Sequence, residues 1–193
     1  MTASSELIRT VALREFAERG VAATSLRSVA QLAGVSLGLV QHHFGTKARL
    51  RSAVDAYVLE TVREAIDSVP LPDPPADVLE EIGHRVTALL GTHPEVLRYV
   101  GRAVIDGDQI AVAVLDQLIA LADAQWDKFA QRGLLRPDAD RTWAGLHSVI
   151  LIVGTVLLRP AIDRHLPEPL LSVRQLARWD QAMADLLRTG LFR

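Results

Sequence analysis

Residues 25–47 read SLRSVAQLAGVSLGLVQHHFGTK, and this segment is the most informative part of the chain about its fold. Gly34 interrupts a helical pattern, because glycine takes turn conformations at little cost. Two short helices held at a fixed angle by such a turn form a helix-turn-helix, whose second helix fits the DNA major groove. Each expected helix begins after a residue whose side chain can cap it: 26–33 after Ser25, 37–43 after Ser36, and a longer helix to about residue 68 after Thr46.

The rest of the chain also carries helical periodicity, without alternating strand patterns. A first helix over 5–19 places Ile8, Val11, Ala12 and Phe16 on one stripe, and Gly20 ends it. Four prolines in 69–75 stop the fourth helix. Further helices are expected at about 76–90, 94–105, 108–132, 138–159 and 171–189. The sequence predicts an all-α fold, with a helix-turn-helix DNA-binding domain over 1–52 and an effector-binding and dimerisation domain over 53–193.

Composition indicates a globular chain of 193 residues, 49% apolar and 23% charged. The absence of cysteine excludes disulfides and thiolate metal sites. No secretory signal is visible at the N-terminus, and the longest uncharged apolar run, 143–158, is shorter than the roughly 20 residues that span a bilayer. We therefore expect a cytoplasmic protein without a membrane partner.

Charge is distributed unevenly along the chain. Residues 1–52 hold seven basic and three acidic side chains, a net charge of +4, whereas residues 53–193 hold 14 basic and 20 acidic ones, a net charge of −6. A cationic head on an acidic body suits a head that binds a polyanion and a body that does not.

Several spaced positions together resemble the TetR (tetracycline-repressor-like) regulators over residues 5–52. The matching segments are Phe16-Ala-Glu-Arg-Gly20, Thr24-Ser-Leu-Arg-Ser-Val-Ala30, Ala33-Gly-Val-Ser36, Gly38, and His43-Phe44 through Lys47. The rest of the chain matches only in its all-helical architecture. The resemblance implies a homodimeric regulator with a ligand pocket in the body.

The expected DNA-binding residues lie on and around the helix at 37–43. The resemblance implies that Leu37, Gly38 and His42 face the bases or the sugar edge; Gly38 would allow a close approach, and Leu37 a thymine methyl contact. Arg27 is able to donate two hydrogen bonds to a guanine, or is a solvated surface arginine. The full expected set is Arg27, Ser28, Ser36, Leu37, Gly38, Gln41, His42, His43 and Lys47.

Gln41 departs from the family, which usually has a tyrosine that bonds a phosphate. Glutamine is able to bond either a phosphate or an adenine edge, and we favour the phosphate. The position of His43 often bonds the DNA backbone in relatives, although a neutral histidine packed against Lys47 is the alternative. Lys47 opens a helix whose free amides favour an anion, so we expect phosphate binding there.

Catalytic and metal sites are not expected. His42 and His43 are adjacent and point in different directions on a helix, and the other four histidines are scattered. The chain has no phosphate-cradling glycine loop, metal triad or nucleophile elbow, so we expect no cofactor and no enzyme activity.

The body is expected to hold an effector pocket and a pairing surface. The helix over 143–158 is apolar enough to be buried all round, yet it contains polar groups that need partners. A pocket for a mostly apolar effector would be lined by Leu115, Ile119, Trp126, Trp143, His147 and Leu151. Pairing would set Val149, Ile150, Val153, Val156 and Leu157 opposite Leu176, Trp179, Met183 and Leu186 in a four-helix interface; alternatively these stripes close each subunit's own core.

These observations predict a ligand-responsive transcriptional regulator, a repressor rather than an activator, that binds a palindromic operator in double-stranded DNA as a homodimer. A small, mostly apolar effector would release it. The alternatives are an activator of the same fold, a helical small-molecule carrier, and an adaptor that binds DNA nonspecifically.

Overall fold

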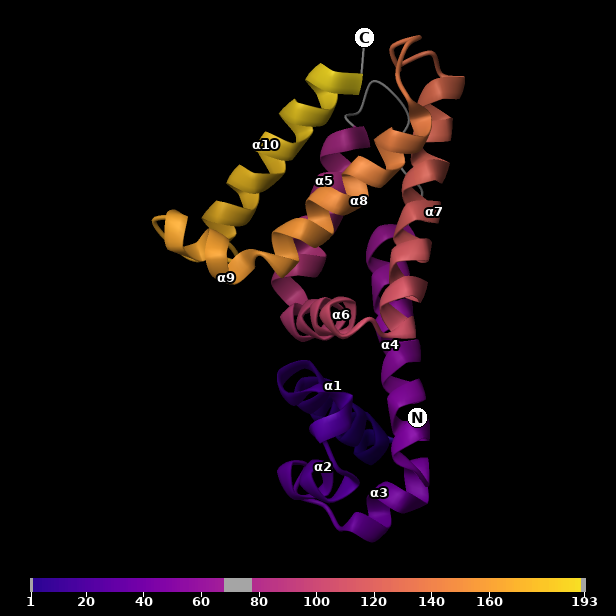
Figure 1. Ribbon diagram of the computed structural model, residues 1–193, viewed down its shortest axis with the longest axis vertical. Coiled ribbons are helices and arrows are strands. Elements are labelled where there is room, and N and C mark those ends of the chain that lie inside the picture. The colour runs from indigo at the N-terminus through magenta and orange to yellow at the C-terminus, as the bar shows by residue number, and fades with distance from the viewer. Residues whose placement is uncertain (1, 68–77, 192–193) are drawn as a thin grey trace. The chain divides into compact units, whose positions relative to one another are not determined.

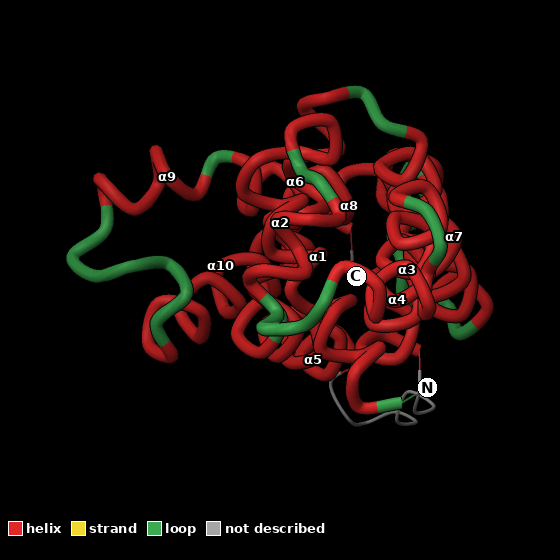
Figure 2. The backbone as a smooth tube through the Cα atoms, turned by 90° about the horizontal axis from the view of Figure 1, so that it is seen from below, coloured by secondary structure: helices red, strands yellow, loops and turns green. Residues whose placement is uncertain are grey.

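The computed structural model describes residues 2–67 and 78–191, and within them it contains helices but no strand (Figures 1 and 2). This confirms the all-α fold. The proline segment 69–75 lies outside the described residues. The elements in chain order are α1 (Ala3–Ala23), α2 (Leu26–Leu32), α3 (Leu37–Phe44), α4 (Lys47–Asp67), α5 (Val78–Thr92), α6 (Pro94–Asp106), α7 (Gln109–Gln131), α8 (Arg141–Leu157), α9 (Arg159–Ile162), the 3₁₀ turn η1 (Asp163–His165) and α10 (Val173–Leu191).

The nine expected helices are all present, with ends within a few residues of those predicted. Gly20 has non-helical backbone angles, with a φ of 79°, so the regular helix that begins α1 ends there as expected, and one further short helical segment follows it within α1. One difference is that α9 and η1 fill a stretch, 159–165, for which no helix was expected.

The helices form two compact units that do not divide at residue 52. The first unit comprises the described residues of Met1–Thr61 and Glu95–Val112, and the second those of Val62–Pro94 and Ala113–Arg193. The first unit therefore includes α6 and the first turn of α7 in addition to the helix-turn-helix. The physical reason is that α6 packs against α1 and α4, which are distant from it in sequence.

The core of the first unit is made of side chains that are almost fully buried. Phe16 is 1% exposed, and its ring centroid lies 6.4 Å from that of Tyr99 on α6. Burying each large apolar side chain contributes about 1.5–3 kcal/mol, so this cluster fixes the unit. The other members that are at most 1% exposed include Ile8, Leu13, Val29, Val40, Leu50 and Val54.

The second unit has its own apolar cluster and a close helix pair. Trp126 and Phe129 on α7 meet edge to face, with ring centroids 5.5 Å apart, and pack with Leu135 and Ala144. The helices α5 and α10 lie against each other (Figure 1). Their crossing is close because Gly83 has no side chain: a methyl group there would overlap the carboxylate of Asp180.

The helix α8 is not buried all round, which corrects the expectation for 143–158. Trp143 is 51% exposed, Ile150 54% and Leu158 61%, whereas Ala144 and Val149 are buried. One face of α8 thus packs inside the second unit, and the other carries large apolar side chains at its surface.

Among the described residues, no single helix has the length and apolar character to cross a membrane. The bent pair Arg141–Leu157 and Arg159–His165, with 65° between its helices, passes that test only when both are taken together.

Candidate nucleic-acid interface

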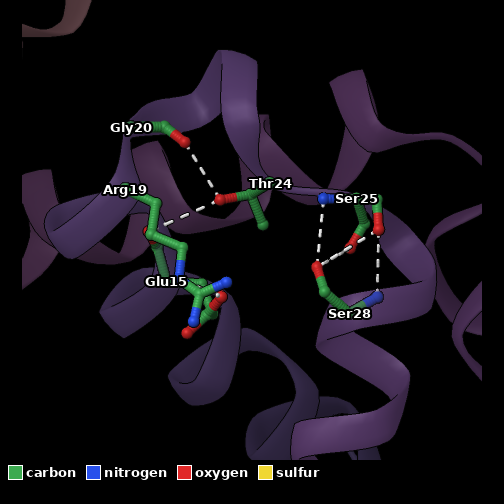
Figure 3. A network of polar contacts seen from close by, with 6 residues as sticks. All are labelled: Glu15, Arg19, Gly20, Thr24, Ser25 and Ser28. Atoms are coloured by element: carbon green, nitrogen blue, oxygen red, sulfur yellow. Dashed lines mark hydrogen bonds and ion pairs between the residues drawn. The ribbon is translucent and has the colours of Figure 1, made fainter.

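The entry to the helix-turn-helix is set by the kink at Gly20 and the side chain of Thr24. The hydroxyl of Thr24, which is 2% exposed, donates to the carbonyl of Gly20 at 2.9 Å and lies 3.4 Å from that of Glu15 (Figure 3). These contacts satisfy carbonyl groups that the kink removes from the helical ladder. They also fix the direction in which the chain leaves α1 and enters α2.

A capping box starts α2. The N–H of Ser28 donates to the hydroxyl of Ser25 at 3.0 Å, and the N–H of Ser25 donates to the hydroxyl of Ser28 at 3.1 Å (Figure 3). The hydroxyl of Ser28 also donates to the carbonyl of Ser25 at 2.8 Å. Ser28 was expected at the DNA surface, and the structure shows that its hydroxyl serves the cap.

The turn and the start of α3 follow the sequence expectations. Gly34 has a φ of 66°, which L side chains rarely adopt, and the N–H of Val35 donates to the carbonyl of Ala30 at 3.0 Å. The N–H of Leu39 then donates to the hydroxyl of Ser36 at 3.1 Å, so Ser36 is the N-cap of α3. The sequence predicted the turn at Gly34 and the cap at Ser36, but not the bond between Val35 and Ala30.

The helix α3 presents one face outward and packs the other on the core. Val40 is 0% exposed and Phe44 8%, and both face the buried cluster of the first unit. The expected DNA-binding residues on or just before α3 differ in exposure. Four are exposed, namely Ser36, Gly38, Gln41 and His42, and two are half-buried, namely Leu37 and His43. Arg27, on α2, is also exposed.

Lys47 is half-buried at the surface of the first unit. Its ammonium donates to the carbonyl of Ala22 at 3.0 Å, which ties the start of α4 to the end of α1. Thr46 caps α4 by accepting from the N–H of Arg49 at 3.2 Å. An ammonium has three donors, so this bond leaves two of them for a phosphate. The ring centroid of His43 lies 5.4 Å from that of His42 and 6.3 Å from that of Phe44.

Behind the helix-turn-helix, α4 is joined to α6 by a polar network that sequence analysis missed. The hydroxyl of Tyr99 donates to Asp55 at 2.5 Å, and Arg51 reaches both Asp55, at 3.6 Å, and Asp108, at 3.0 Å. Burial raises the pKa of Tyr99, and the hydrogen bond to Asp55 raises it further, so the phenol stays protonated as a donor. The only sequence signal was the spacing of Arg51 and Asp55, four residues apart on one helix face.

Burial raises the pKa of Asp55 in turn, against the opposing effects of the Tyr99 hydrogen bond and the Arg51 charge. The carboxylate therefore depends on these two partners. We expect Tyr99→Phe to lower the free energy of unfolding by about 1–3 kcal/mol, because it leaves a partly buried acceptor without its donor.

Urea unfolding monitored by circular dichroism measures this loss. Tyr57→Phe is the matched control: Tyr57 lies on α4 beneath the Arg9 guanidinium, 4.2 Å from its ring centroid, and phenylalanine keeps that ring. An equal loss in both variants would contradict a special role for the Tyr99 hydroxyl.

A second link in the first unit joins α6 to the kink of α1. Arg102 pairs with Asp106 at 2.8 Å, and its guanidinium lies against Gly20, 3.3 Å from where a Cβ would stand. The first unit thus fixes α1 at Gly20 and α4 at Asp55 from the same helix, α6.

The expected effector-pocket residues fall in two different environments. Trp126 is 4% exposed in the core cluster, and Leu115, Ile119 and Leu151 are half-buried. Trp143 and His147 instead lie at the surface of α8, with their rings 5.1 Å apart. Those two side chains do not belong to an interior pocket of a single chain, because the exposed face of α8 carries them.

The expected pairing residues are divided in the same way. Val149 and Leu176 are buried within the protomer. These two side chains therefore fit the alternative interpretation, in which they close the core of their own subunit. Leu186 is 57% exposed and Ile150 54%, and the remaining members are half-buried: Val153, Val156, Leu157, Trp179 and Met183. The indole N–H of Trp179 donates to the hydroxyl of Thr155 at 3.2 Å, which joins α10 to α8.

In residues 2–67 and 78–191 there is no group of three or more His, Asp or Glu side chains placed to hold a metal ion.

Comparison with known proteins agrees with this geometry. Residues 8–54 match the family model of bacterial regulatory proteins, tetR family. The HTH-type transcriptional regulatory protein RaaS of Mycobacterium tuberculosis is 29% identical over 133 residues, which cover 69% of this chain and 60% of that protein. An HTH-type transcriptional repressor of the same species is 39% identical over 92 residues, 48% of this chain and 42% of the relative. The chain thus matches less than two thirds of the length of either relative.

The fold extends beyond the matched head. The structure of the SmeT–triclosan complex superposes with a TM-score of 0.75 at 19% identity, covering 100% of this chain and 93% of that one. The helix-turn-helix geometry and the family match lead to one conclusion: residues 8–54 are similar to the bacterial regulatory proteins of the tetR family, and the whole chain shares its fold with SmeT.

Proposed function

We propose that this protein, which is not an enzyme, is a repressor of the TetR family that binds a palindromic operator as a homodimer and is released by a small, mostly apolar effector. Relatives of the head carry the names of transcriptional regulators, and one is named a repressor. Such a protein acts in the cytoplasm, where the DNA lies. The head supplies the DNA contacts and the second unit the pairing.

Gly38 is the observation that carries the DNA-binding part of the proposal. It lies in the first turn of α3 and is exposed, and the nearest atom to a Cβ built there is the hydroxyl oxygen of Ser36, 3.8 Å away. The protein therefore has room for a side chain at this position, although glycine costs a helix about 0.5–1 kcal/mol relative to alanine. A glycine that the fold does not need is explained by a partner that approaches the backbone closely.

Gly38→Ala separates these two roles. We expect the variant to be at least as stable as the parent, because alanine favours the helix and meets no neighbour. We expect its operator affinity to fall about tenfold, equivalent to about 1.4 kcal/mol, because the methyl group holds α3 away from the groove. Thermal unfolding and fluorescence anisotropy on labelled DNA measure the two effects. Lower stability with unchanged operator affinity would mean that Gly38 serves the fold and not the approach to DNA.

The direct test of the proposal is binding to DNA from upstream of the protein's own gene. The fragment should bind at least 100-fold more tightly than a shuffled sequence of the same composition, at about 150 mM salt and without effector. Footprinting should show two protected half-sites about one helical turn apart. Equal affinity for both fragments with an unlocalised footprint would instead favour the nonspecific adaptor.

The exposed face of α8 supports pairing. Trp143, Ile150 and Leu158 are each more than half exposed, and Leu186 on α10 is too. Side chains of this size, at helical spacing on two neighbouring helices, suit an isologous interface with the same face of a second copy.

Ile150→Glu is expected to convert a dimer into a monomer, because two carboxylates would be buried near the two-fold axis. Sedimentation velocity measures the change in mass. Val112→Glu is the control, since Val112 is equally exposed, at 57%, but lies in the first unit. A parent that sediments as a monomer at micromolar concentration would contradict this part of the proposal.

Effector release is supported by two observations. SmeT, which shares the fold, is the repressor of a multidrug efflux pump of Stenotrophomonas maltophilia and binds triclosan in one structure. In this chain α6 contacts both α1 and α4, so a ligand that displaces α6 would move the supports of the head. Binding to the second unit would then change DNA affinity by favouring a different arrangement of the two heads.

Triclosan is a suitable first probe. We propose that it quenches the buried Trp126 and lowers the fraction of operator bound. Quenching without loss of operator binding would indicate a carrier rather than a ligand-responsive repressor.

A further inference from the structure

A groove of about 910 Å³ runs along the seam between α5 and α10 within the second unit. The two helices are antiparallel there, since Gly83 lies opposite Asp180 and Gly91 opposite Leu176. The face of α10 that lines the groove carries Leu176, Ala177 and Asp180. Of the α10 residues considered for pairing it includes only Leu176, which is buried within the protomer, and not Trp179, Met183 or Leu186. The groove is also distinct from the α7 and α8 residues considered for the effector.

At the floor of the groove, no described residue donates a hydrogen bond to the carboxylate of Asp180. Asp180 is 8% exposed and packs on the backbone of Gly83. Among the described residues, its one charged neighbour within ion-pair range is His84, whose Nε2 lies 3.8 Å from Oδ2, beyond hydrogen-bond distance. The side chain of Asp180 keeps 12% of its surface exposed, and both carboxylate oxygens are able to accept hydrogen bonds from a molecule in the groove. Burial correspondingly raises the pKa of Asp180.

The negative charge is concentrated at one part of the groove. Glu80 also lies on its wall, with Oε1 3.8 Å from the same Nε2 of His84, so two carboxylates share one imidazole. Arg188 lines the groove beyond them, but its guanidinium is paired with Asp185 at 3.5 Å. This part of the groove therefore favours a cation.

The other part of the groove is apolar. Leu176, Leu171 and Val173 line it, and Val173 is 88% exposed, which is unusual for an apolar side chain without a partner. Asp180 and Val173 are seven residues apart on α10, or about 10 Å along its axis. A ligand that fits both parts has a cationic group and an apolar group about that far apart.

We propose that the α5–α10 groove is a binding site for a small organic cation, with its ammonium group on Asp180 and its alkyl or aryl body against Leu176 and Val173. The ammonium supplies the donors that the carboxylate lacks, and the apolar body covers Val173. The groove volume lies in the range of small-molecule sites.

The probes are 4-phenylbutylamine, which has this length, and 4-phenylbutanol, its neutral counterpart. Isothermal titration of the full chain should show the amine binding at least tenfold more tightly than the alcohol. Asp180→Asn, which keeps the size of the side chain against Gly83, should abolish the preference. Asp116→Asn, which neutralises an exposed acid on α7, should preserve it.

Val173→Lys is a second variant that does not put folding at risk, because Val173 is almost fully exposed. It should weaken both probes about tenfold by placing a charge at the apolar end. The proposal is overturned if the amine shows no binding up to about 10 mM, if amine and alcohol bind equally, or if both Asp180→Asn and Val173→Lys bind the amine as the parent does. None of these outcomes depends on operator binding.

Discussion

The double variant Gln41→Glu/His42→Glu is expected to lose operator affinity by about 100-fold, or about 2.7 kcal/mol, while its unfolding curve stays unchanged. Both side chains are exposed on α3, so the substitutions leave the buried face of Val40 and Phe44 intact. In the proposed complex each new carboxylate lies beside DNA phosphates, where it repels them and replaces a hydrogen-bond donor. Fluorescence anisotropy at fixed salt measures the loss.

A matched control for this variant exists in the second unit. Gln131→Glu/His165→Glu makes the same changes at two exposed positions far along the chain from α3. It should bind the operator within about twofold of the parent, because long-range repulsion is screened over about 8 Å at physiological salt. Comparable losses in both variants would mean that net charge, and not the surface of α3, controls binding.

Phe16→Ala is expected to have the largest effect on stability, lowering the free energy of unfolding by about 3–5 kcal/mol. Phe16 is 1% exposed and contacts Tyr99, so its removal opens a cavity between α1 and α6. Since whole domains are stable by only about 5–15 kcal/mol, this loss removes a substantial part of the free energy of unfolding. Urea denaturation measures the loss, and Phe16→Leu, which refills most of the volume, should cost less than about 1.5 kcal/mol.

Hydrogen exchange locates the effect of Phe16→Ala. Amides of α6 should lose protection together with those of α1 and α4, because all three belong to the first unit. Protection of α6 that survives while α1 exchanges freely would show that α6 is stable without the head.

The head was the most predictable part of the fold, because its signals are local. Ser25, Ser36 and Thr46 each cap a helix as expected, and Gly34 takes the positive φ that its place in the turn requires. Caps and turns act within three or four residues, so a single sequence records them. The outward face of α3 followed from the same periodicity that buried Val40.

The attachment of α6 to the head was not predictable, because it joins positions 44 residues or more apart. Tyr99 and Asp55 show no shared pattern along the chain, and the spacing of Arg102 and Asp106 indicates only a pair within one helix. Which helix a buried tyrosine meets is decided by packing over the whole unit. The functional boundary expected at residue 52 stays a prediction.

The helix α8 shows that an apolar sequence does not distinguish side chains buried inside the protomer from apolar side chains at its surface. Trp143 and Ile150 have the hydrophobicity of core residues, yet they lie at the surface of the protomer, and Val149 beside them is buried. Hydrophobic content measures a preference to leave water and does not indicate which chain provides the cover. The expected pocket mixed both kinds of position and therefore stays a prediction.

The discontinuous make-up of the first unit constrains how regulators of this type are recombined. A hybrid protein that takes only residues up to Thr61 from this chain would lose Tyr99 and Arg102, and would present Phe16 and Asp55 to a foreign helix. Transplanting the segment Glu95–Val112 along with the head retains both anchoring points. Swapping DNA specificity in this protein is thus a matter of grafting two pieces, and a single crossover point does not suffice.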